Sequence, residues 1–273
     1  MEVWSLKLQK KFYEQTCLDK VVNHDWEGEI KSAGNKVMIR VRPTVTVGDY
    51  TSYQDITYQD LTDDKIELQV DKQKYFAFKV DDIDQAQADI NIINETTQDA
   101  SEQMKITVEQ DVFANVYSSA TSTVDGATTL RDSSNIIDWI IDAGVALDEN
   151  KVGSEGRFLI IPPWVAGMIK KSDLRDASLA GDGQSILRNG RIGMIDRFTL
   201  YVSNNLVGTK AQGTPTNCIA GTRDAISFAS QFTKTETVRL QNQFGDAIRG
   251  LKVYGYQVTQ PDALVHATAA STV

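Results

Sequence analysis

The side chains most suited to chemistry in this sequence are its two cysteines and two histidines. Cys17 and Cys218 lie 201 residues apart, and His24 and His266 lie in terminal segments without closely spaced metal-binding partners. This spacing matches neither a disulfide framework nor a zinc site, in which Cys and His ligands come in short pairs. It fits a protein that stays in a reducing compartment.

Three other patterns associated with binding or catalysis are incomplete. The segment Gly181–Gln184 lacks the Gly-Lys-Ser/Thr that grips phosphate and Mg²⁺, so a surface loop explains it. The acidic run Asp81–Asp84 lacks the glycine and distal glutamate of a calcium-binding hand, and helix capping explains it. No Gly-x-Ser-x-Gly elbow is present. We therefore predict no catalytic residue, no cofactor and no metal site.

The overall composition is that of an ordinary globular protein. The chain has 273 residues, of which 41% are hydrophobic and 24% charged, enough for a sizeable core or two modest domains. The net charge of −9 and the pI near 4.8 argue against nucleic-acid binding as the main function. We expect a soluble intracellular protein, because there is no signal-peptide core and no apolar run near the ~18 residues of a membrane span.

Charge is distributed unevenly along the chain. Residues 1–150 carry 14 Lys/Arg and 28 Asp/Glu, a net charge of −14. Residues 151–273 carry 14 Lys/Arg and 9 Asp/Glu, a net charge of +5. Solvated faces alone can produce this difference. The alternative is that the acidic half of one subunit lies against the basic half of another, as self-assembling proteins can arrange.

The longest predicted element is a helix that begins near Asp81. No Gly or Pro occurs from residue 49 to 125, and three aspartates crowd the helix start, where backbone N–H groups lack partners. About 33 helical residues would span roughly 50 Å. Apolar or small residues recur along one thin face, at Ile83, Ala86, Ile90, Ile93, Thr97, Ala100, Met104 and Val108. Such a helix is a strut more than the centre of a compact core.

Alternating residues before this helix predict an extended hairpin. Residues 37–41 alternate between apolar and polar types, and the alternation returns over 66–70 and 76–80. The turn is expected over 63–65 or over 71–73. Because a two-stranded ribbon is marginal in water, the hairpin packs either on its own domain or on another subunit.

The flanking segments predict an N-terminal arm and a compact α/β region. Residues 4–22 form either an amphipathic helix through Trp4, Leu8, Phe12 and Leu18 or an arm that orders on a neighbour. Beyond residue 125 we predict a helix over 136–147 capped by Ser134 or Asn135, a buried strand over 157–161, and a short helix over 164–172 with Pro163 suited to its first turn. A glycine-rich loop over 178–193 and a strand over 194–206 follow. The last predicted elements are a strand that begins at residue 217, a turn at Gly221-Thr222, a short helix or strand up to residue 232, and alternating strands over 235–269.

This order of elements resembles the major capsid proteins of tailed phages, which have the Hong Kong 97 fold. A motif before the long helix strengthens the resemblance to one coat-protein subfamily. Its residues here are Gly34, Val37, Ile39, Asp49, Tyr50, Asp71, Gln73, Phe76, Phe78, Val80, Asp81 and Asp82. The close match covers roughly residues 20–120, and the element order covers the whole chain.

The resemblance implies an α+β fold with four parts. Residues 1–34 correspond to the N-terminal arm and residues 35–80 to the extended loop that lies across a neighbouring subunit. Residues 81–125 and 226–273 correspond to the peripheral domain, with its spine helix and return strands. Residues 126–225 correspond to the axial domain, whose loops meet around the five- and six-fold axes.

The function implied by the resemblance is that of a major capsid protein, not an enzyme. Pentamers and hexamers of the chain would build an icosahedral shell that encloses double-stranded DNA without sequence-specific binding. Expected inter-subunit contacts are Tyr50, Tyr53, Tyr58, Asp63, Asp64, Lys65, Phe76, Phe78, Asp81 and Asp82. Some relatives crosslink through a Lys of the extended loop, but no motif selects Lys65 or Lys72 for this.

The implied partners are further copies of the chain, scaffolding and portal proteins, and the packaged DNA, with no membrane. The implied location is the virion capsid, after synthesis in the host cytoplasm. Two rivals stay open at this point. One is an encapsulin-like compartment shell of the same fold that holds enzyme cargo, and the other is a soluble α+β enzyme with scattered catalytic residues.

Overall fold

The structure, a computed structural model, describes most of the chain. The described residues are 13–14, 16–30, 36–43, 45–53, 55, 58–61, 64–81, 92–125, 133–172, 193–211, 214–241 and 244–271. Several predictions fall outside this range: the first part of the N-terminal arm or helix, Asp63 in the expected turn, Asp82 and Asp84 at the expected helix start, and the loop at Gly181–Gln184.

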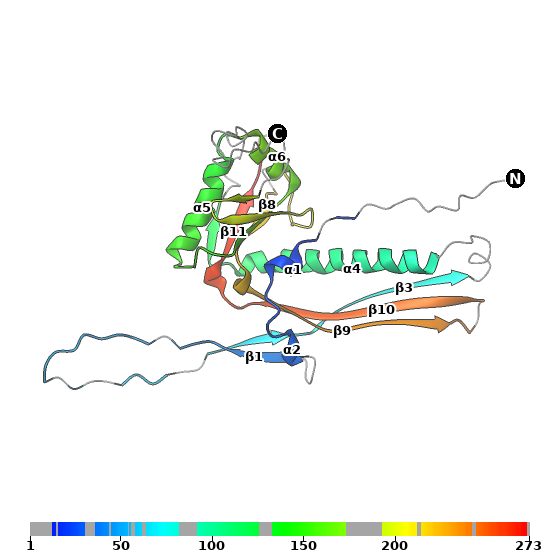
Figure 1. Cartoon of the computed structure of the whole chain (residues 1–273), viewed down its shortest axis with the longest axis horizontal. Helices are drawn as coiled ribbons and strands as arrows, with labels where there is room; N and C mark the ends of the chain where they lie inside the picture. The colour runs from blue at the N-terminus through cyan, green and yellow to red at the C-terminus, as the bar shows by residue number, and fades with distance from the viewer. Residues whose placement is uncertain are drawn as a thin grey trace.

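A long three-stranded antiparallel sheet forms the lower part of the molecule in Figure 1. Its strand order is β3-β10-β9, with β3 at Lys72–Asp81, β10 at Gly245–Val258 and β9 at Ile226–Arg239. The helix α4 (Ile92–Val116) runs along one face of this sheet. The strand β3 alternates between exposed and half-buried positions, so the period-two pattern of its sequence is confirmed.

A mixed sheet and two helices form the compact part of the fold. The strand order in this sheet is β4-β11-β8-β5-β7-β6. The helix α5 spans Ile136–Glu149 and α6 spans Pro163–Lys171. The strands are β4 Ser122–Val124, β5 Arg157–Ile161, β6 Met194–Ile195, β7 Phe198–Val202, β8 Thr216–Thr222 and β11 Leu264–Ala269. Every residue of β5 is buried, as its apolar run predicts, and Pro163 occupies the first turn of α6.

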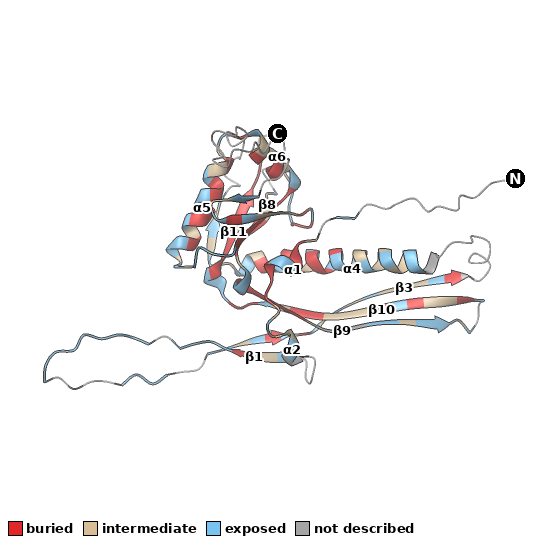
Figure 2. Ribbon diagram, in the orientation of Figure 1, coloured by how far each residue is buried: buried red, intermediate tan, exposed pale blue. Residues whose placement is uncertain are grey.

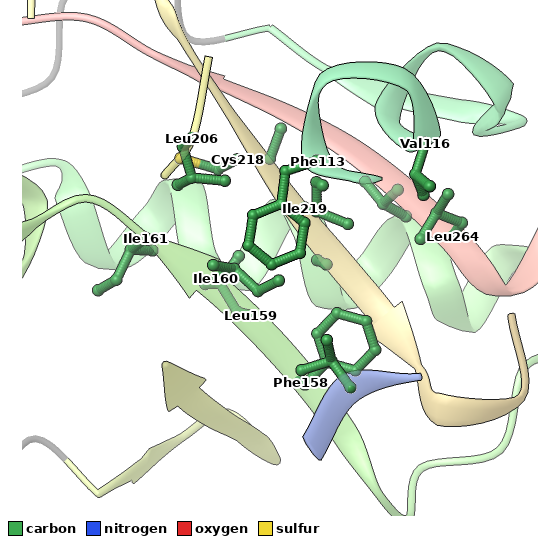
Figure 3. Packing of buried hydrophobic residues seen from close by; sticks show 14 of the residues in the cluster. Phe113, Val116, Phe158, Leu159, Ile160, Ile161, Leu206, Cys218, Ile219 and Leu264 are labelled. Carbon is green, nitrogen blue, oxygen red and sulfur yellow. The ribbon is translucent and has the colours of Figure 1, made fainter. Parts of the chain in front are cut away.

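The main hydrophobic core lies where α4 meets the six-stranded sheet. Phe113 and Val116 of α4 pack against residues of β5, β8 and β11, including Ile160 (Figure 3). Burial along α4 is concentrated from Ile106 onward, and the earlier turns are exposed or half-buried (Figure 2). The helix has 25 described residues, so it extends well past the core it contacts. This agrees with a strut-like helix, but Asp81 is the last residue of β3, so the prediction that the helix begins there is wrong.

The extended loop is a short two-stranded stem with a long connecting segment. The strands β1 (Lys36–Arg40) and β2 (Lys65–Gln69) pair antiparallel, with Val37 opposite Leu68. The N–H of Val41 donates to the carbonyl of Asp64 at 2.9 Å, which continues the stem by one bond. The connecting segment then reaches away from the rest of the molecule (Figure 1). Asp64 and Lys65 therefore lie at the base of the loop, and the prediction of a turn at these residues is wrong.

A second, small core holds this stem on the long sheet. Its buried members are Ile39, Leu68, Val70 and Ala229, and Trp26 and Val253 pack against them. The apolar residues of β1 and β2 thus contact β9 and β10. The base of the loop is fixed by this packing, whereas the distal segment has no comparable cluster among the described residues.

The strand pairing divides the chain differently from the predicted ranges. The strand β3 pairs with β10 and not with β2, so residues 71–73 do not form a hairpin turn. Residues 72–81 belong to the long sheet, whereas β4 and β11 belong to the six-stranded sheet. The alternation from Lys65 onward contains no Gly or Pro, so the backbone stays extended while it passes from one sheet to the next.

Two further local predictions differ from the structure. The described part of 4–22 is helical only at α1 (Leu18–Val21), and a second short helix, α2, follows at Glu27–Ile30. The strand expected over 194–206 is a hairpin, because Asp196 and Arg197 between β6 and β7 have φ of +44° and +66°. Among the described residues, 3₁₀ turns also occur at Tyr117–Ser119, Arg223–Ala225 and Pro261–Ala263.

Candidate assembly surfaces

The distal part of the extended loop carries large side chains that its own chain leaves exposed. We call the whole segment that connects the two stem strands beyond Arg42, residues 43–64, the loop tip; its last residue, Asp64, borders the stem. Tyr53 is fully exposed, Tyr58 and Val47 are 90% and 92% exposed, and Tyr50 is 69% exposed. The loop tip also contains five aspartates and no Lys or Arg. Such a concentration of exposed aromatic and aliphatic groups is characteristic of an interaction surface.

The other predicted contact residues lie in different surroundings. Asp64 and Lys65 are exposed at the base of the loop. Phe76 and Phe78 are half-buried and stack on one another, with ring centroids 6.3 Å apart. Phe76 also covers Gly250 of β10, where a Cβ atom would meet the ring. Both rings pack within their own chain, so a contact with another subunit applies only to their exposed parts.

The acidic end of β3 is only partly described. Asp81 is the last residue of β3 and pairs with Gly245 in the backbone register. Asp82 and Asp63 lie outside the described residues. Their predicted roles in subunit contacts therefore stay predictions.

The face of the long sheet opposite α4 is a second candidate surface, which we call the far face. It follows from the register, because Lys72 of β3 contacts α4 and the alternate residues point the other way. Tyr75 is 80% exposed there. The remaining members, from the paired positions of the three strands, are Ala77, Lys79, Ala247, Arg249, Leu251, Lys234, Glu236 and Val238. Among the members named here, three side chains are cationic and one is anionic, so these residues carry a net positive charge; the side chain of Asp81, next in the alternation, is not described.

Ion pairs and the loop stem organise the far face. Arg249 and Lys234 both pair with Glu236, the former at 2.7 Å. The end of the sheet near Val253 is covered by the loop stem of the same chain, whereas the other end is not covered by described residues. The far face is therefore a pre-formed, partly apolar and basic surface.

A polar cluster fixes α4 on the opposite face of the long sheet. The hydroxyl of Tyr254 donates to Asp111 at 2.9 Å, and the ammonium of Lys72 lies 3.1 Å from the same carboxylate. Tyr256 donates to the backbone carbonyl of Asp111 at 3.1 Å, and its ring lies beneath the Lys72 ammonium. Burial, followed by the contact with Asp111, raises the pKa of Tyr254. These contacts join residues distant in sequence and hold the helix in one position.

A buried carboxylate joins α4 to the N-terminal segment and to the six-stranded sheet. Glu109 is fully buried, and one of its oxygens accepts from the N–H groups of Cys17 and Leu18 at 2.6 and 2.9 Å. The other oxygen accepts from Ser203 and Asn205 at 2.8 and 2.9 Å. The predicted apolar stripe includes Val108 but gives no indication that the next residue is buried.

A buried arginine has a similar role inside the compact part. Arg157 of β5 donates to the carbonyls of Gly153 and Val152 and to the carboxylate of Asp148 at 2.6 Å. Hydrogen bonds from Arg197 and then Arg157 hold the pKa of Asp148 below its usual value. The cluster ties β5 to the end of α5 and to the β6–β7 turn, so its role is structural.

The cysteines and His266 are also buried in the fold. Burial, with a smaller contribution from Glu109, raises the pKa of the Cys17 thiol to about 12, and burial alone raises that of Cys218. Protonated, enclosed thiols are poor nucleophiles. His266 accepts or donates one hydrogen bond with Asn217 and packs on Tyr117.

The described residues contain no group of three or more His, Cys, Asp and Glu side chains that could hold a metal ion. Within the same residues, no helix combines the length and the apolar character needed to cross a bilayer.

The comparison with protein families identifies the class of protein. The family model described as phage capsid protein matches residues 42–267, so the chain belongs to this family. No match was found among curated proteins. The chain is thus a structural protein of the phage capsid, and its location is the virion capsid.

Solved structures confirm the fold. A chain from Mycobacterium phage Che8 superposes with a TM-score of 0.86 and 28% identity, over 98% of this chain and 96% of that one. The capsid of cyanophage P-SCSP1u gives a TM-score of 0.81 at 13% identity, over 100% of this chain and 93% of that one. The mature capsid of bacteriophage PhiM1 gives a TM-score of 0.76 at 13% identity, over 98% of this chain and 91% of that one. The predicted Hong Kong 97-type fold and major capsid function are confirmed.

Proposed function

We propose that the chain assembles through pentamers and hexamers into an icosahedral shell that encloses double-stranded DNA. The observation that carries this proposal is the loop tip, whose tyrosines and valines are exposed far from the two cores of their own chain. A surface of this kind gains stability when a neighbouring subunit covers it. The extended loop is therefore assigned to contacts between subunits.

The far face of a neighbouring subunit is the surface that we assign to the loop tip. The tip has five aspartates and no Lys or Arg, whereas the far face has Lys79, Lys234 and Arg249 against one glutamate. Opposite charges steer the two surfaces together, and the exposed tyrosines and valines of the tip supply apolar contact with Tyr75 and Val238. Within this proposal Tyr50, Tyr53, Tyr58, Asp63, Asp64 and Lys65 make the contact, and Phe76, Phe78, Asp81 and Asp82 flank it.

The two surfaces differ from one another, so the contact is head-to-tail. Head-to-tail contacts between identical subunits close into rings when the rotation permits, as pentamers and hexamers require. Many such contacts, each weak alone, then hold a shell together by multivalency.

The remaining partners in the proposal are scaffolding and portal proteins and the packaged DNA. The net charge of −9 supports an enclosed DNA that is not bound by sequence, because phosphate binding needs clustered Lys and Arg. Membership of the phage capsid family supports DNA, and not enzyme cargo, as the content of the shell. Synthesis in the host cytoplasm and the absence of enzyme activity belong to the same proposal.

The loop tip provides the decisive test. Replacing residues 45–61 by a short Gly-Ser linker removes the exposed tyrosines and keeps both strands of the stem. We expect a folded subunit with unchanged circular dichroism that forms no closed shells by negative-stain electron microscopy, with the phage scaffolding protein present. The matched control is Lys171→Glu on the exposed end of α6, which leaves the loop and far face intact and should assemble. Normal shells from the loop-deleted chain would refute the assignment.

A further inference from the structure

The buried carboxylate of Glu109 connects three parts of the subunit: α4, the N-terminal segment and the six-stranded sheet. It lies on α4, and its five hydrogen-bond donors, which include the Cys17 thiol at 4.0 Å, come from the N-terminal segment and from the turn after β7. Gln110, the next residue of α4, adds a bond from its side-chain amide to Asn205 at 3.1 Å. The junction therefore contains residues from α4, the N-terminal segment and the six-stranded sheet.

A buried carboxylate is stable only while its donors stay in place. Glu109 has no exposed surface, so water cannot replace a donor that moves away. Charge-assisted hydrogen bonds are about twice as strong as neutral ones, and losing them leaves both the acceptor and the backbone N–H groups without partners. Movement of either neighbouring part is therefore opposed by the same carboxylate.

The contact of Glu109 with the N-terminal segment determines where that segment leaves the rest of the subunit. Farther along the chain the segment is held independently, because Arg223 donates to the carbonyl of Val22 and the N–H of Asn23 donates to Ile226, both at 2.8 Å. Glu109 holds Cys17 and Leu18, the residues that precede those anchors. The residues before Cys17 thus start from a position that Glu109 sets.

The second contact determines how the six-stranded sheet is oriented on α4. Ser203 and Asn205 directly follow β7, and both hydroxyl and amide point to the same oxygen of Glu109. The N–H of Asn205 in turn donates to the Ser203 hydroxyl at 3.1 Å, which stiffens the turn. A change in the angle between α4 and this sheet would pull these donors away from the carboxylate.

We propose that Glu109 is a positioning residue for assembly, which fixes the angle between the six-stranded sheet and α4 together with the exit of the N-terminal arm. Subunits of one angle build shells of one curvature, and subunits with a loose angle build particles of mixed diameter. This inference rests on the proposed assembly into closed shells. Glu109 is therefore a determinant of shell size, in addition to its contribution to stability.

The test compares Glu109→Ala and Glu109→Gln with the parent chain. In unassembled subunits we measure trypsin cleavage after Lys20, whose side chain is exposed on α1. Because a protease needs an unfolded segment, the peptide bond after Lys20 is protected as long as α1 stays folded on the subunit. We expect Glu109→Ala to accelerate this cleavage roughly tenfold or more, because local opening exposes the site. Glu109→Gln keeps one oxygen for the Cys17 and Leu18 N–H groups and should stay near the parent rate.

Particle diameters measured by cryo-electron microscopy provide the second readout. Both variants should widen the diameter distribution, because the Gln amide group faces the donor of Asn205. The matched control is Glu102→Gln, which removes a carboxylate of α4 that pairs with Lys105 on the exposed side. Unchanged Lys20 cleavage in Glu109→Ala, or unchanged diameters in both variants, would overturn the proposal.

Two further variants cover the case in which Glu109→Ala does not fold. Ser203→Ala and Asn205→Ala each remove one donor from the sheet side and leave the N-terminal contact in place. We expect wider diameter distributions with normal Lys20 protection, and unchanged diameters would again contradict the proposal. Failure of the parent chain to form shells would count against the proposed function, whereas the cleavage assay judges the Glu109 contact itself.

Discussion

At the scale of single residues, Gly255 lies where the loop stem packs closely on the long sheet. A Cβ atom at this position would lie 2.0 Å from the carbonyl oxygen of Gln69 and 2.8 Å from the Cα atom of Val70. Both are backbone atoms where β2 leaves the loop stem, so they cannot rotate away as a side chain can. The absence of a side chain at residue 255 allows the stem to lie on β10.

We predict that Gly255→Ala destabilises the subunit by about 1–3 kcal/mol, the usual range for overpacking a well-packed site. Urea unfolding of the unassembled subunit measures the change in the free energy of unfolding. The matched control is Gly153→Ala, since a Cβ atom there has nothing within 4 Å. Equal effects of the two substitutions would show that the contact between stem and sheet adapts easily.

His266 gives the subunit a dependence on mildly acidic pH. Burial lowers the pKa of His266 below its ordinary value, so the folded state favours the neutral imidazole. The stability from this preference is complete above the unfolded pKa of about 6.5 and is lost as the pH falls from there toward the folded pKa.

We predict that the free energy of unfolding decreases as the pH is lowered below about 6.5, and that His266→Gln reduces this decrease. Urea unfolding over a pH series measures the slope. The comparison variant is His24→Gln, which keeps His266 and its hydrogen bond with Asn217. A slope that is identical in the parent and in His266→Gln would mean that other groups control the acid response.

Sequence patterns predict exposure and burial of single residues unequally. The exposed tyrosines of the loop were predictable, because they lie in a polar segment with no apolar partner positions. Glu109 and Asp111 were not, since both are acidic residues of a helix that carries many acidic residues. Only the distant donors, such as Asn205 and Tyr254, distinguish them, and no local pattern encodes such contacts.

At the scale of elements, the Asp111 cluster determines how α4 lies on the long sheet. Tyr254 has no exposed surface, and its hydroxyl donates to Asp111 beside the Lys72 ammonium. Three polar groups from α4, β3 and β10 therefore meet at one point. Apolar packing alone would leave the half-exposed helix free to slide along the strands.

We predict that Tyr254→Phe destabilises the subunit by about 1–3 kcal/mol, because a hydrogen bond to a charged group is lost. Tyr75→Phe is the matched control, since Tyr75 is 80% exposed on the far face, and it should change stability by less than ~0.5 kcal/mol. Thermal and urea unfolding of both variants test the difference. A neutral result for Tyr254→Phe would assign the helix position to the hydrophobic core alone.

The strands show why element types are easier to predict than their partners. Alternation correctly identifies β1, β2 and β3, because one face of each strand is more buried than the other. It carries no information on pairing, however, and β3 pairs with residues more than 160 positions away, such as Gly245 with Asp81. The β6–β7 hairpin was missed for a local reason, since its turn uses Asp196 and Arg197 in the left-handed region without a glycine.

At the scale of the whole molecule, charge complementarity between loop tip and far face makes assembly sensitive to salt. We predict that the assembly rate decreases as NaCl is raised toward about 1 M, where the screening length falls to ~3 Å. Light scattering after mixing subunits with the phage scaffolding protein measures the rate. A rate independent of salt would mean that apolar contacts alone drive the encounter.

Charge-reversal substitutions test whether the salt sensitivity of assembly comes from the loop tip and the far face. Lys79→Glu with Lys234→Glu should slow assembly, and adding Asp49→Lys and Asp60→Lys on the loop tip should restore part of the rate. Lys171→Glu has the same change in charge per residue away from both surfaces and is the control. If the tip substitutions give no restoration, the loop tip contacts a different surface.

The long sheet receives its central strand late in the chain, and the six-stranded sheet receives its second strand later still. The strand β10 (245–258) lies between β3 and β9, and β11 (264–269) lies between β4 and β8. During translation neither sheet can be completed until these residues have left the ribosome, because β10 joins β3 to β9 and β11 joins β4 to β8. A chain that terminates before residue 264 lacks the strand that holds β4 on the six-stranded sheet. We expect such truncated products to be excluded from the particle without a dedicated proofreading step, because the subunit becomes competent to assemble only when synthesis has passed this strand.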